Sequence, residues 1–368
     1  MEKHYYYPLD KLKQFEKDVF MGIGVPEDEA EICADVLNAA DARGIDSHGA
    51  GRLKPIYYDR IVNSKIQNAQ TKIEIERDVA ATAVVNGNNG MGFVVAKKSM
   101  DMAIEKARTY GVGVVIAKNS THFGIAAYYP LMAAAQDMIG LTCTNARPSI
   151  APTWGVDNML GTNPLVFAMP TDEPFPFTND FATSTAQRGK IEQYARENKT
   201  LPAGWVIDQN GETMTDPHEV LKALTAGTAA LTPVGGIGEE LGGHKGYGYA
   251  TVVELLSGAM QLGPFLKGLG GIENGKKVPI YLGHFFMAID ISHFEDVEKV
   301  KKHTGDILRS LRHSKKAAGA ERIYTHGEKE HYHTLEREKT GVPLPPLVCQ
   351  QMVQMRDELG LDYEFEWE

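Results

Sequence analysis

Apolar side chains recur at helical spacing near both ends of the chain. The helices that this spacing predicts span residues 9–21, 26–43, 297–314 and 346–360. The apolar faces of the first two are formed by Leu12, Phe15 and Val19, and by Cys33, Val36, Leu37 and Ala40. Since an amphipathic helix must bury its apolar face, we expect residues 1–74 and 296–368 to pack together as one helical domain.

The middle of the chain alternates between β-prone and helical segments. The predicted strands lie within residues 79–87, 112–120, 139–145, 164–169 and 284–291. The predicted helices between them span residues 93–111, 126–136 and 249–260. This order predicts an α/β domain with a mixed sheet over residues 75–295.

A glycine-rich turn in residues 84–98 resembles the start of a Rossmann crossover. Gly90, Gly92 and Ala96 give a loose G-x-G-x-x-x-A, whereas a dinucleotide fingerprint has a third glycine at residue 95, where Val stands. No acidic residue ends the following strand, which closes on Lys118 and Asn119. We therefore expect an ordinary turn and a non-Rossmann fold.

Composition and charge narrow the class of partner. The 368 residues include 43% hydrophobic and 23% charged side chains, as in ordinary globular enzymes. A net charge of −10 argues against nucleic acid or an anionic membrane as a partner. The start of the chain lacks a signal-peptide core, and no apolar run suits a membrane span. Three widely spaced cysteines predict a reduced, cytoplasmic protein.

The stretch DARGIDSHGAGR, residues 41–52, holds the first candidate chemistry. If residues 47–52 form a helical turn, His48 and Arg52 share one face. Imidazole can exchange a proton near neutral pH, and guanidinium grips a carboxylate through two hydrogen bonds. Together they suit a 2-hydroxy or 2-oxo acid. A solvated helix cap is the competing explanation.

Two further stretches place cations and free backbone N–H groups together. KNSTHFG brings His122 and Gly124 just past a predicted strand end, where a phosphate or carbonyl could bind. GGIGEELGGHKGYGYA places His244 and Lys245 in a glycine-rich loop at a helix start. A lysine there opposes the helix dipole unless an anion is bound, so an anionic ligand explains it.

Short polar side chains around two later strands are less specific. Thr162, Asn163 and Asp180 could contact a ligand, and structural turns explain them equally well. His326, His331 and His333 cluster in the tail, but their acidic neighbours suggest surface histidines, and no zinc-type spacing occurs. We expect no metal site.

Taken in order, these segments resemble the malate/L-lactate dehydrogenase family, which is distinct from the Rossmann-type lactate and malate dehydrogenases. That family also holds ureidoglycolate and sulfolactate dehydrogenases and cyclic imino-acid reductases. The matching stretches are DARGIDSHGAGR, NSTHFG, TN…APTWG, LGTNPLVFAMP, DFATSTAQRGKIE, GWVIDQNGETMTDP, LGGHKGYGYA and THGE.

The resemblance implies an NAD(P)-dependent oxidoreductase that interconverts a small 2-hydroxy acid and its 2-oxo acid, with malate or L-lactate first. It implies a homodimer with NAD or NADP bound on the non-Rossmann α/β domain. His48 would exchange the proton with Ser47 in its relay, or His122 would take this role. Arg52 and Thr162 would bind the substrate. The residues implied at the cofactor are His122, Phe123, Gly124, Asp180, Phe181, Ala182, His244, Lys245, Gly327 and Glu328.

Two departures from the family pattern stand out. Lys190 replaces an acid that completes the proton relay in some relatives, and His326 replaces the usual proline before Gly327. Judged from the residues themselves, two other classes stay open. One is a lyase or hydrolase of a small carboxylate that uses no nicotinamide, and the other is a nucleotide-binding regulator without turnover.

Overall fold

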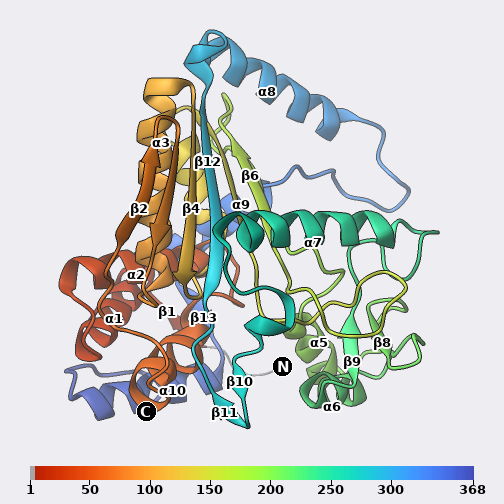
Figure 1. The fold of residues 1–368 in the computed structure, drawn as a ribbon. Coiled ribbons are helices and arrows are strands. Elements are labelled where there is room, and N and C mark those ends of the chain that lie inside the picture. Colours follow the sequence, from red (N-terminus) through yellow and green to blue (C-terminus); the bar gives the residue numbers. More distant parts are fainter. Residues whose placement is uncertain (1–4) are drawn as a thin grey trace.

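A seven-stranded mixed sheet forms the centre of the computed structural model, which describes residues 5–368. The strand order is β2-β3-β4-β12-β5-β6-β7 (Figure 1). Within it, β3 and β4 pair in parallel and all other neighbours are antiparallel. The strands are β2 (Glu74–Val79), β3 (Thr82–Asn86), β4 (Val112–Ser120), β5 (Met138–Thr144), β6 (Leu165–Met169), β7 (Phe177–Asn179) and β12 (Leu282–Asp290). The expected mixed α/β architecture is confirmed.

Helices cover the two faces of this sheet unequally. On one face, α3 (Gly92–Tyr110) and α4 (Tyr128–Ala134) bury a core that includes Met100, Val115 and Phe286. On the other face, α7 (Gly243–Ser257) crosses part of the sheet and packs Val253 against Ile116 and Phe285. Further along that second face, α8 (Val297–His313) lies over Met169 of β6 and Phe177 of β7.

The space beside the glycine-rich turn before α3 is occupied by the backbone of Thr121 and His122. Gly92 N donates to Thr121 Oγ1 (2.9 Å), and Met91 N donates to Thr71 Oγ1 (3.0 Å). A Cβ atom on Gly92 would overlap the carbonyl oxygens of Thr121 and His122. The glycine therefore lets the chain after β4 pass directly over the N-terminus of α3, where a Rossmann fold would hold a pyrophosphate.

The two ends of the chain share a hydrophobic core, in which Phe15, Leu37 and Tyr57 meet Met352. Phe93 of α3 joins the same core, which ties it to the sheet. The elements here are β1 (Tyr5–Tyr7), α1 (Leu9–Gly22), α2 (Glu27–Ala42), η1 (Ala50–Arg52), the wide helical segment η2 (Leu53–Asn63), α9 (Glu328–Thr340), β13 (Val342–Leu344) and α10 (Pro346–Leu359).

Helix α8 (Val297–His313) lies beside β6 and β7 (Figure 1), and its Arg312 pairs with Glu328 at the start of α9 (4.0 Å). The boundaries proposed from the sequence, residues 1–74 with 296–368 and residues 75–295, stay a prediction.

The segment between β5 and β12 builds a small lobe with its own core, which includes Ile150, Ile191, Val206 and Leu231. Its elements and the connections that follow are α5 (Arg188–Arg196), β8 (Val206–Asp208), α6 (Pro217–Ala226), β9 (Ala229–Leu231), η3 (Ala259–Gln261), η4 (Leu266–Leu269), β10 (Ile272–Glu273) and β11 (Lys276–Lys277), while η5 (Ile291–His293) follows β12. In residues 5–368, no helix is both long and apolar enough to cross a membrane. Cys33, Cys143 and Cys349 are buried and unpaired.

We predict that Gly92→Ala lowers the free energy of unfolding by about 1–3 kcal/mol, because the new methyl group must displace the backbone of Thr121 and His122. Chemical denaturation followed by far-ultraviolet circular dichroism measures the change. Gly248→Ala is the matched control: it lies inside α7 with open space at its Cβ position and should stabilise by up to ~1 kcal/mol. Equal behaviour of the two variants would contradict the packing argument.

Candidate active site

The stretch that holds His48 and Arg52 is a series of tight turns after α2. His48 N donates to Ile45 O (2.9 Å), and Arg52 N donates to Gly49 O (2.8 Å) at the start of a short 3₁₀ turn. Residues 47–52 therefore do not form the single helical turn considered from the sequence. Arg52 nevertheless folds back, because its Nε donates to Ser47 O (2.5 Å). The guanidinium is held beside the segment that carries His48.

Asp41, at the end of α2, supports this loop from beneath. Its Oδ2 accepts a hydrogen bond from Ala50 N (2.7 Å), and a Cβ atom on Gly49 would overlap its carboxyl group. Burial raises the pKa of Asp41 to about 7. Arg337 of α9 pairs with Asp46 and donates to the Asp41 carbonyl. Helices from both ends of the chain thus fix the loop.

Two imidazole rings lie face to face at the centre of the site. The rings of His48 and His122 are stacked, with centroids 5.7 Å apart and an angle of 16° between their planes. Ser47 Oγ lies 2.9 Å from His48 Nδ1, as a relay requires. Burial, and then the charge of Arg52, lower the pKa of His48 to about 4. His48 is therefore neutral at physiological pH.

Tyr57 of η2 and the Gly124 N–H both contact Nδ1 of His122. Tyr57 Oη lies 2.6 Å from His122 Nδ1, and Gly124 N lies 3.4 Å from the same nitrogen. Since a backbone N–H can only donate, Nδ1 is the acceptor and the ring proton sits on Nε2. Burial lowers the pKa of His122 well below its usual value, with His48 and then Arg60 as further causes. Sequence reasoning missed Tyr57, whose apolar neighbours suggest an ordinary core residue.

His122 lies two residues past the end of β4, an inner strand of the sheet. Strand β4 ends at Ser120, opposite Leu282 at the start of β12, and Thr144 at the end of β5 pairs with His284. The Phe123 ring stacks on His284, with centroids 4.5 Å apart and planes 6° apart. Phe123 is thus buried in the floor of the site, and Gly124 follows it with φ of 76°.

The predicted substrate and nicotinamide residues are linked by backbone contacts. Thr162 O accepts from Thr183 N (2.9 Å), one residue after Ala182. Asp180 lies near Arg43 of the first motif; burial raises the pKa of Asp180 to about 6, and Arg43 opposes this rise. Phe181 is exposed, whereas Ala182 is buried. The 180–183 turn therefore connects the Thr162 segment to the DARG end of the first motif.

His244 and Lys245 occupy the first turn of α7, as expected for a helix start. Val234 N donates to Thr183 O (2.9 Å), and Gly246 packs against Val234, so this turn adjoins the same connected set of residues. His244 Nδ1 is buried without a hydrogen-bond partner in the described part of the chain. Lys245 is exposed and forms no ion pair within residues 5–368. An anionic group fits this helix end.

Gly327 and Glu328, the last residues predicted at the cofactor, make hydrogen bonds and contacts that stabilise the turn before α9. Gly327 has φ of 92° and packs against Pro176 O, while His326 O accepts from Thr178 N (3.3 Å). Glu328 is buried, accepts from Thr325 N (3.1 Å) and pairs with Arg322. Its carboxylate is thus already hydrogen-bonded by the chain.

Lys190, which replaces a relay acid of some relatives, is exposed on α5 and donates to Gln193 (3.0 Å).

Ser47, His48, Arg52 and His122, which the sequence analysis singled out, lie together in one cluster, and Tyr57 joins them. Among residues 5–368, no three His, Cys, Asp or Glu side chains are grouped as a metal site would group them.

Comparison with known proteins finds one family that matches nearly the whole chain. Residues 7–353 match the family model described as malate/L-lactate dehydrogenase. The chain is 41% identical over 361 residues to a malate dehydrogenase of Pyrococcus horikoshii, covering 98% of this chain and 97% of that one. It is 38% identical over 349 residues to an L-sulfolactate dehydrogenase of Methanocaldococcus jannaschii, covering 94% and 95% of the two chains.

A solved structure extends the match to three dimensions. The crystal structure of malate dehydrogenase from Entamoeba histolytica matches this fold with a TM-score of 0.94 at 40% sequence identity, covering 99% of this chain and 100% of that chain. Since the family model, the curated relatives and the solved structure all match nearly the whole chain, this protein belongs to the malate/L-lactate dehydrogenase family.

Proposed function

We propose that the protein is an NAD(P)-dependent dehydrogenase that interconverts a small 2-hydroxy acid and its 2-oxo acid, with malate as the first substrate to expect. The observation that carries the proposal is the pair of neutral, stacked imidazoles of His48 and His122 beside the Arg52 guanidinium. The nicotinamide supplies or accepts the hydride, and the protein aligns the substrate and moves the proton.

In this proposal each side chain has one task. Arg52 holds the carboxylate next to the reacting carbon, which orients the substrate. His48 removes the hydroxyl proton during oxidation, because its depressed pKa keeps it unprotonated. During reduction, the bound anion offsets the charge of Arg52 and raises the pKa of His48, which helps it to deliver a proton. Tyr57 and Ser47 hold the two rings in place.

The cofactor fits a site other than the α3 N-terminus. At α3 the backbone of Thr121 and His122 fills the space. At α7, His244 Nδ1 and Lys245 have no hydrogen-bond or ion-pair partner within residues 5–368, which suits phosphate groups. We therefore propose a non-Rossmann mode of binding on the α/β domain, with Asp180, Phe181 and Ala182 near the nicotinamide nucleotide. NAD and NADP are both retained as candidates.

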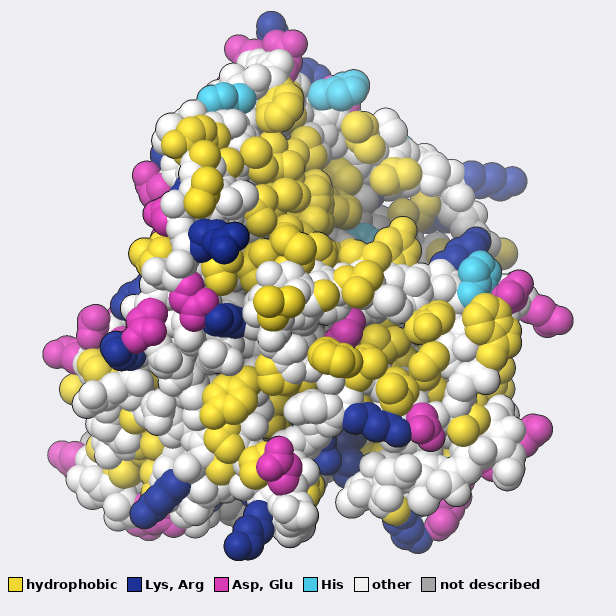
Figure 2. All heavy atoms as spheres, in the orientation of Figure 1, with side chains coloured by type: hydrophobic (Ala, Val, Ile, Leu, Met, Phe, Trp, Pro, Cys, Tyr) yellow, Lys and Arg dark blue, Asp and Glu magenta, His cyan; other side chains and the backbone are white. Residues whose placement is uncertain are grey.

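A second copy of the chain would cover the open face of the sheet. Two cross-strand rows on this face, both half-buried, are formed by Val114, Met287, Leu141 and Phe167, and by Val112, Ile289 and Ile139. In Figure 2, apolar side chains gather over this part of the sheet, above α7. Soluble monomers rarely leave so continuous an apolar surface. We propose that it is the interface of a homodimer.

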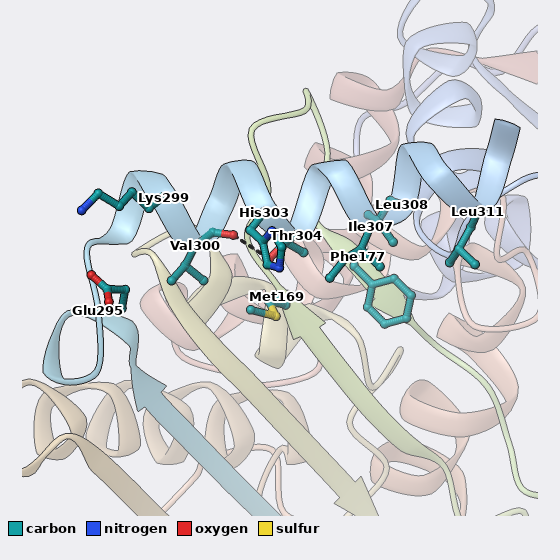
Figure 3. A pocket seen from close by; sticks show the side chains of 10 residues that line it. All are labelled: Met169, Phe177, Glu295, Lys299, Val300, His303, Thr304, Ile307, Leu308 and Leu311. Atoms are coloured by element: carbon teal, nitrogen blue, oxygen red, sulfur yellow. Dashed lines mark hydrogen bonds between the residues drawn. The ribbon is translucent and has the colours of Figure 1, made fainter.

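Helix α8 extends this surface. Between α8 and the edge of the sheet lies an open apolar cavity of about 590 Å³. In Figure 3, Met169 and Phe177 face the underside of α8, where Val300, Ile307 and Leu311 project. Ile307 and Leu311 are 52% and 55% exposed. A partner side chain inserted here would bury both.

The buried, unpaired cysteines fit a reducing compartment, so we also propose that the protein is cytoplasmic.

We predict turnover of malate or a related 2-hydroxy acid, seen as the near-ultraviolet absorbance of reduced nicotinamide. Both NAD⁺ and NADP⁺ are tested against a panel of hydroxy acids. His48→Ala should lower kcat by on the order of 10²-fold or more, because proton transfer is lost, while cofactor binding measured by fluorescence survives. Unchanged turnover would remove His48 from this role, and His122→Ala would then be decisive. Cofactor binding without turnover by wild type would instead favour a regulator.

We predict that the acidic limb of the pH profile of kcat/KM for oxidation lies well below the usual histidine range, toward about pH 4, because His48 acts as a neutral base whose pKa is about 4. Activity is present above this pKa and is lost as the pH falls through it. Arg52→Gln removes one cause of the depressed pKa and should move the limb upward. The substrate ionises equally in both assays, so coincident limbs would contradict the coupling.

We predict that the protein is a dimer by light scattering after size-exclusion chromatography and that Ile307→Glu shifts it toward monomer, because a charge on the exposed face of α8 opposes burial. Leu347→Glu, on α10 and 64% exposed, is the control and should stay dimeric. A monomeric wild type, or an Ile307→Glu variant as dimeric as the control, would exclude this interface.

A further inference from the structure

We propose that Arg60 and Arg147 form a second anion subsite that binds a distal carboxylate or sulfonate of the substrate, so that the enzyme prefers dianionic 2-hydroxy acids to lactate. The inference rests on the proposed function, in which Arg52 already holds the carboxylate at the reacting end. It adds the residues that recognise the other end of the substrate.

Arg60 reaches the site from η2. It follows Tyr57 by three residues on this helical segment, and Tyr57 Oη contacts His122 Nδ1 at 2.6 Å. The Arg60 charge also acts on both neighbours: it is the second of the charges that lower the pKa of His122, ahead of Arg52, and it opposes the rise in the pKa of Tyr57. Arg60 therefore lies close to the proton-transfer pair.

Arg147 lies in the loop that follows β5 of the sheet. It follows Asn145, which is buried just past the end of β5 and fixed by Gly283 N (2.9 Å) and Pro264 O (3.4 Å). A Cβ atom on Gly161 would overlap Ala146 O, so the Thr162 segment passes directly beside Arg147. Burial lowers the pKa of Arg60 and the charge of Arg147 lowers it further, so the two guanidinium groups are close enough to interact.

The acids around the site are already engaged with other partners. Asp59, next to Arg60 in sequence, accepts from Lys54 (2.9 Å) and Asn63 (2.8 Å). Asp46 pairs with Arg337, and Asp180 lies near Arg43. Within residues 5–368, neither Arg60 nor Arg147 makes an ion pair or a side-chain hydrogen bond. The two cations thus lie within electrostatic reach of each other without a counter-ion from the described chain.

Two like charges held together and partly desolvated are unfavourable unless an anion joins them. A carboxylate or sulfonate placed between two guanidinium groups accepts charge-assisted hydrogen bonds from both. A monocarboxylate such as lactate offers one anionic group, which Arg52 holds, and leaves this pair unsatisfied. A dianionic substrate neutralises both ends, which explains why the chain keeps more arginines here than one carboxylate requires.

The test compares kcat/KM for malate and for lactate in Arg60→Gln, Arg147→Gln and wild type. For malate we expect a loss of about 10- to 100-fold in each variant, the usual range for a charged hydrogen bond. For lactate we expect a change within about threefold, so the preference for malate collapses. Arg147 is exposed on a loop, so its variant should fold even if Arg60→Gln does not.

Three controls separate the outcomes. Arg188→Gln, on the exposed side of α5, should leave both substrates unchanged. Arg52→Lys should raise KM for both, since the shared carboxylate loses its bidentate partner. Equal losses for malate and lactate in the Arg147 variant, or a raised KM for the cofactor with unchanged substrate preference, would overturn the subsite.

If the proposed function fails, the subsite can still be tested by measuring substrate binding in place of turnover. If wild type turns over no hydroxy acid, the subsite is judged by calorimetry with malate and lactate, with and without coenzyme. Malate must then bind at least about tenfold more tightly than lactate, and Arg147→Gln must remove that difference. Equal affinities would overturn the subsite.

Discussion

The hydrogen bond between Tyr57 Oη and His122 Nδ1 joins the two halves of this active site. Tyr57 belongs to the core built by the chain ends, whereas His122 follows β4 of the sheet. Neither half contains the whole site: the terminal segments bring His48 and Arg52, and the sheet brings His122. The stacking of the two imidazoles therefore depends on how accurately the terminal core docks against the sheet.

This docking depends in turn on close backbone packing. Gly92 allows the residues after β4 to cross over the start of α3, and Phe93 then enters the terminal core beside Tyr57 (centroids 4.6 Å apart). On the other side, Gly49 and Ala50 close on the Asp41 carboxyl group. Glycine is needed at both points because a side chain would separate the backbones. The site is thus a seam between two closely packed parts.

The sequence predicts the elements that have strong periodicity. Residues 9–21 and 112–120 agree with α1 and β4, because amphipathic spacing and β-branched runs leave one stable arrangement for each. Strand β2 and helix α9 were not predicted, since β2 is exposed throughout and α9 is polar on most of its surface. The site shows the same division. His48, His122 and Arg52 carry motif signals, whereas Tyr57 and Arg60 depend on contacts between distant segments, which one sequence does not encode locally.

The electrostatics of the site differ from those of the whole chain. The net charge of −10 would repel an organic anion, but surface charges beyond about 10 Å are screened by salt, so the local set decides. Locally, the acids Asp46, Asp59 and Asp180 are matched by Arg337, Lys54 and Arg43. Arg52, Arg60 and Arg147 remain without such partners in the described chain, and their combined field favours neutral imidazoles. The same field that attracts an anion therefore keeps the base unprotonated, so substrate binding and proton transfer are coupled through one cluster of charges.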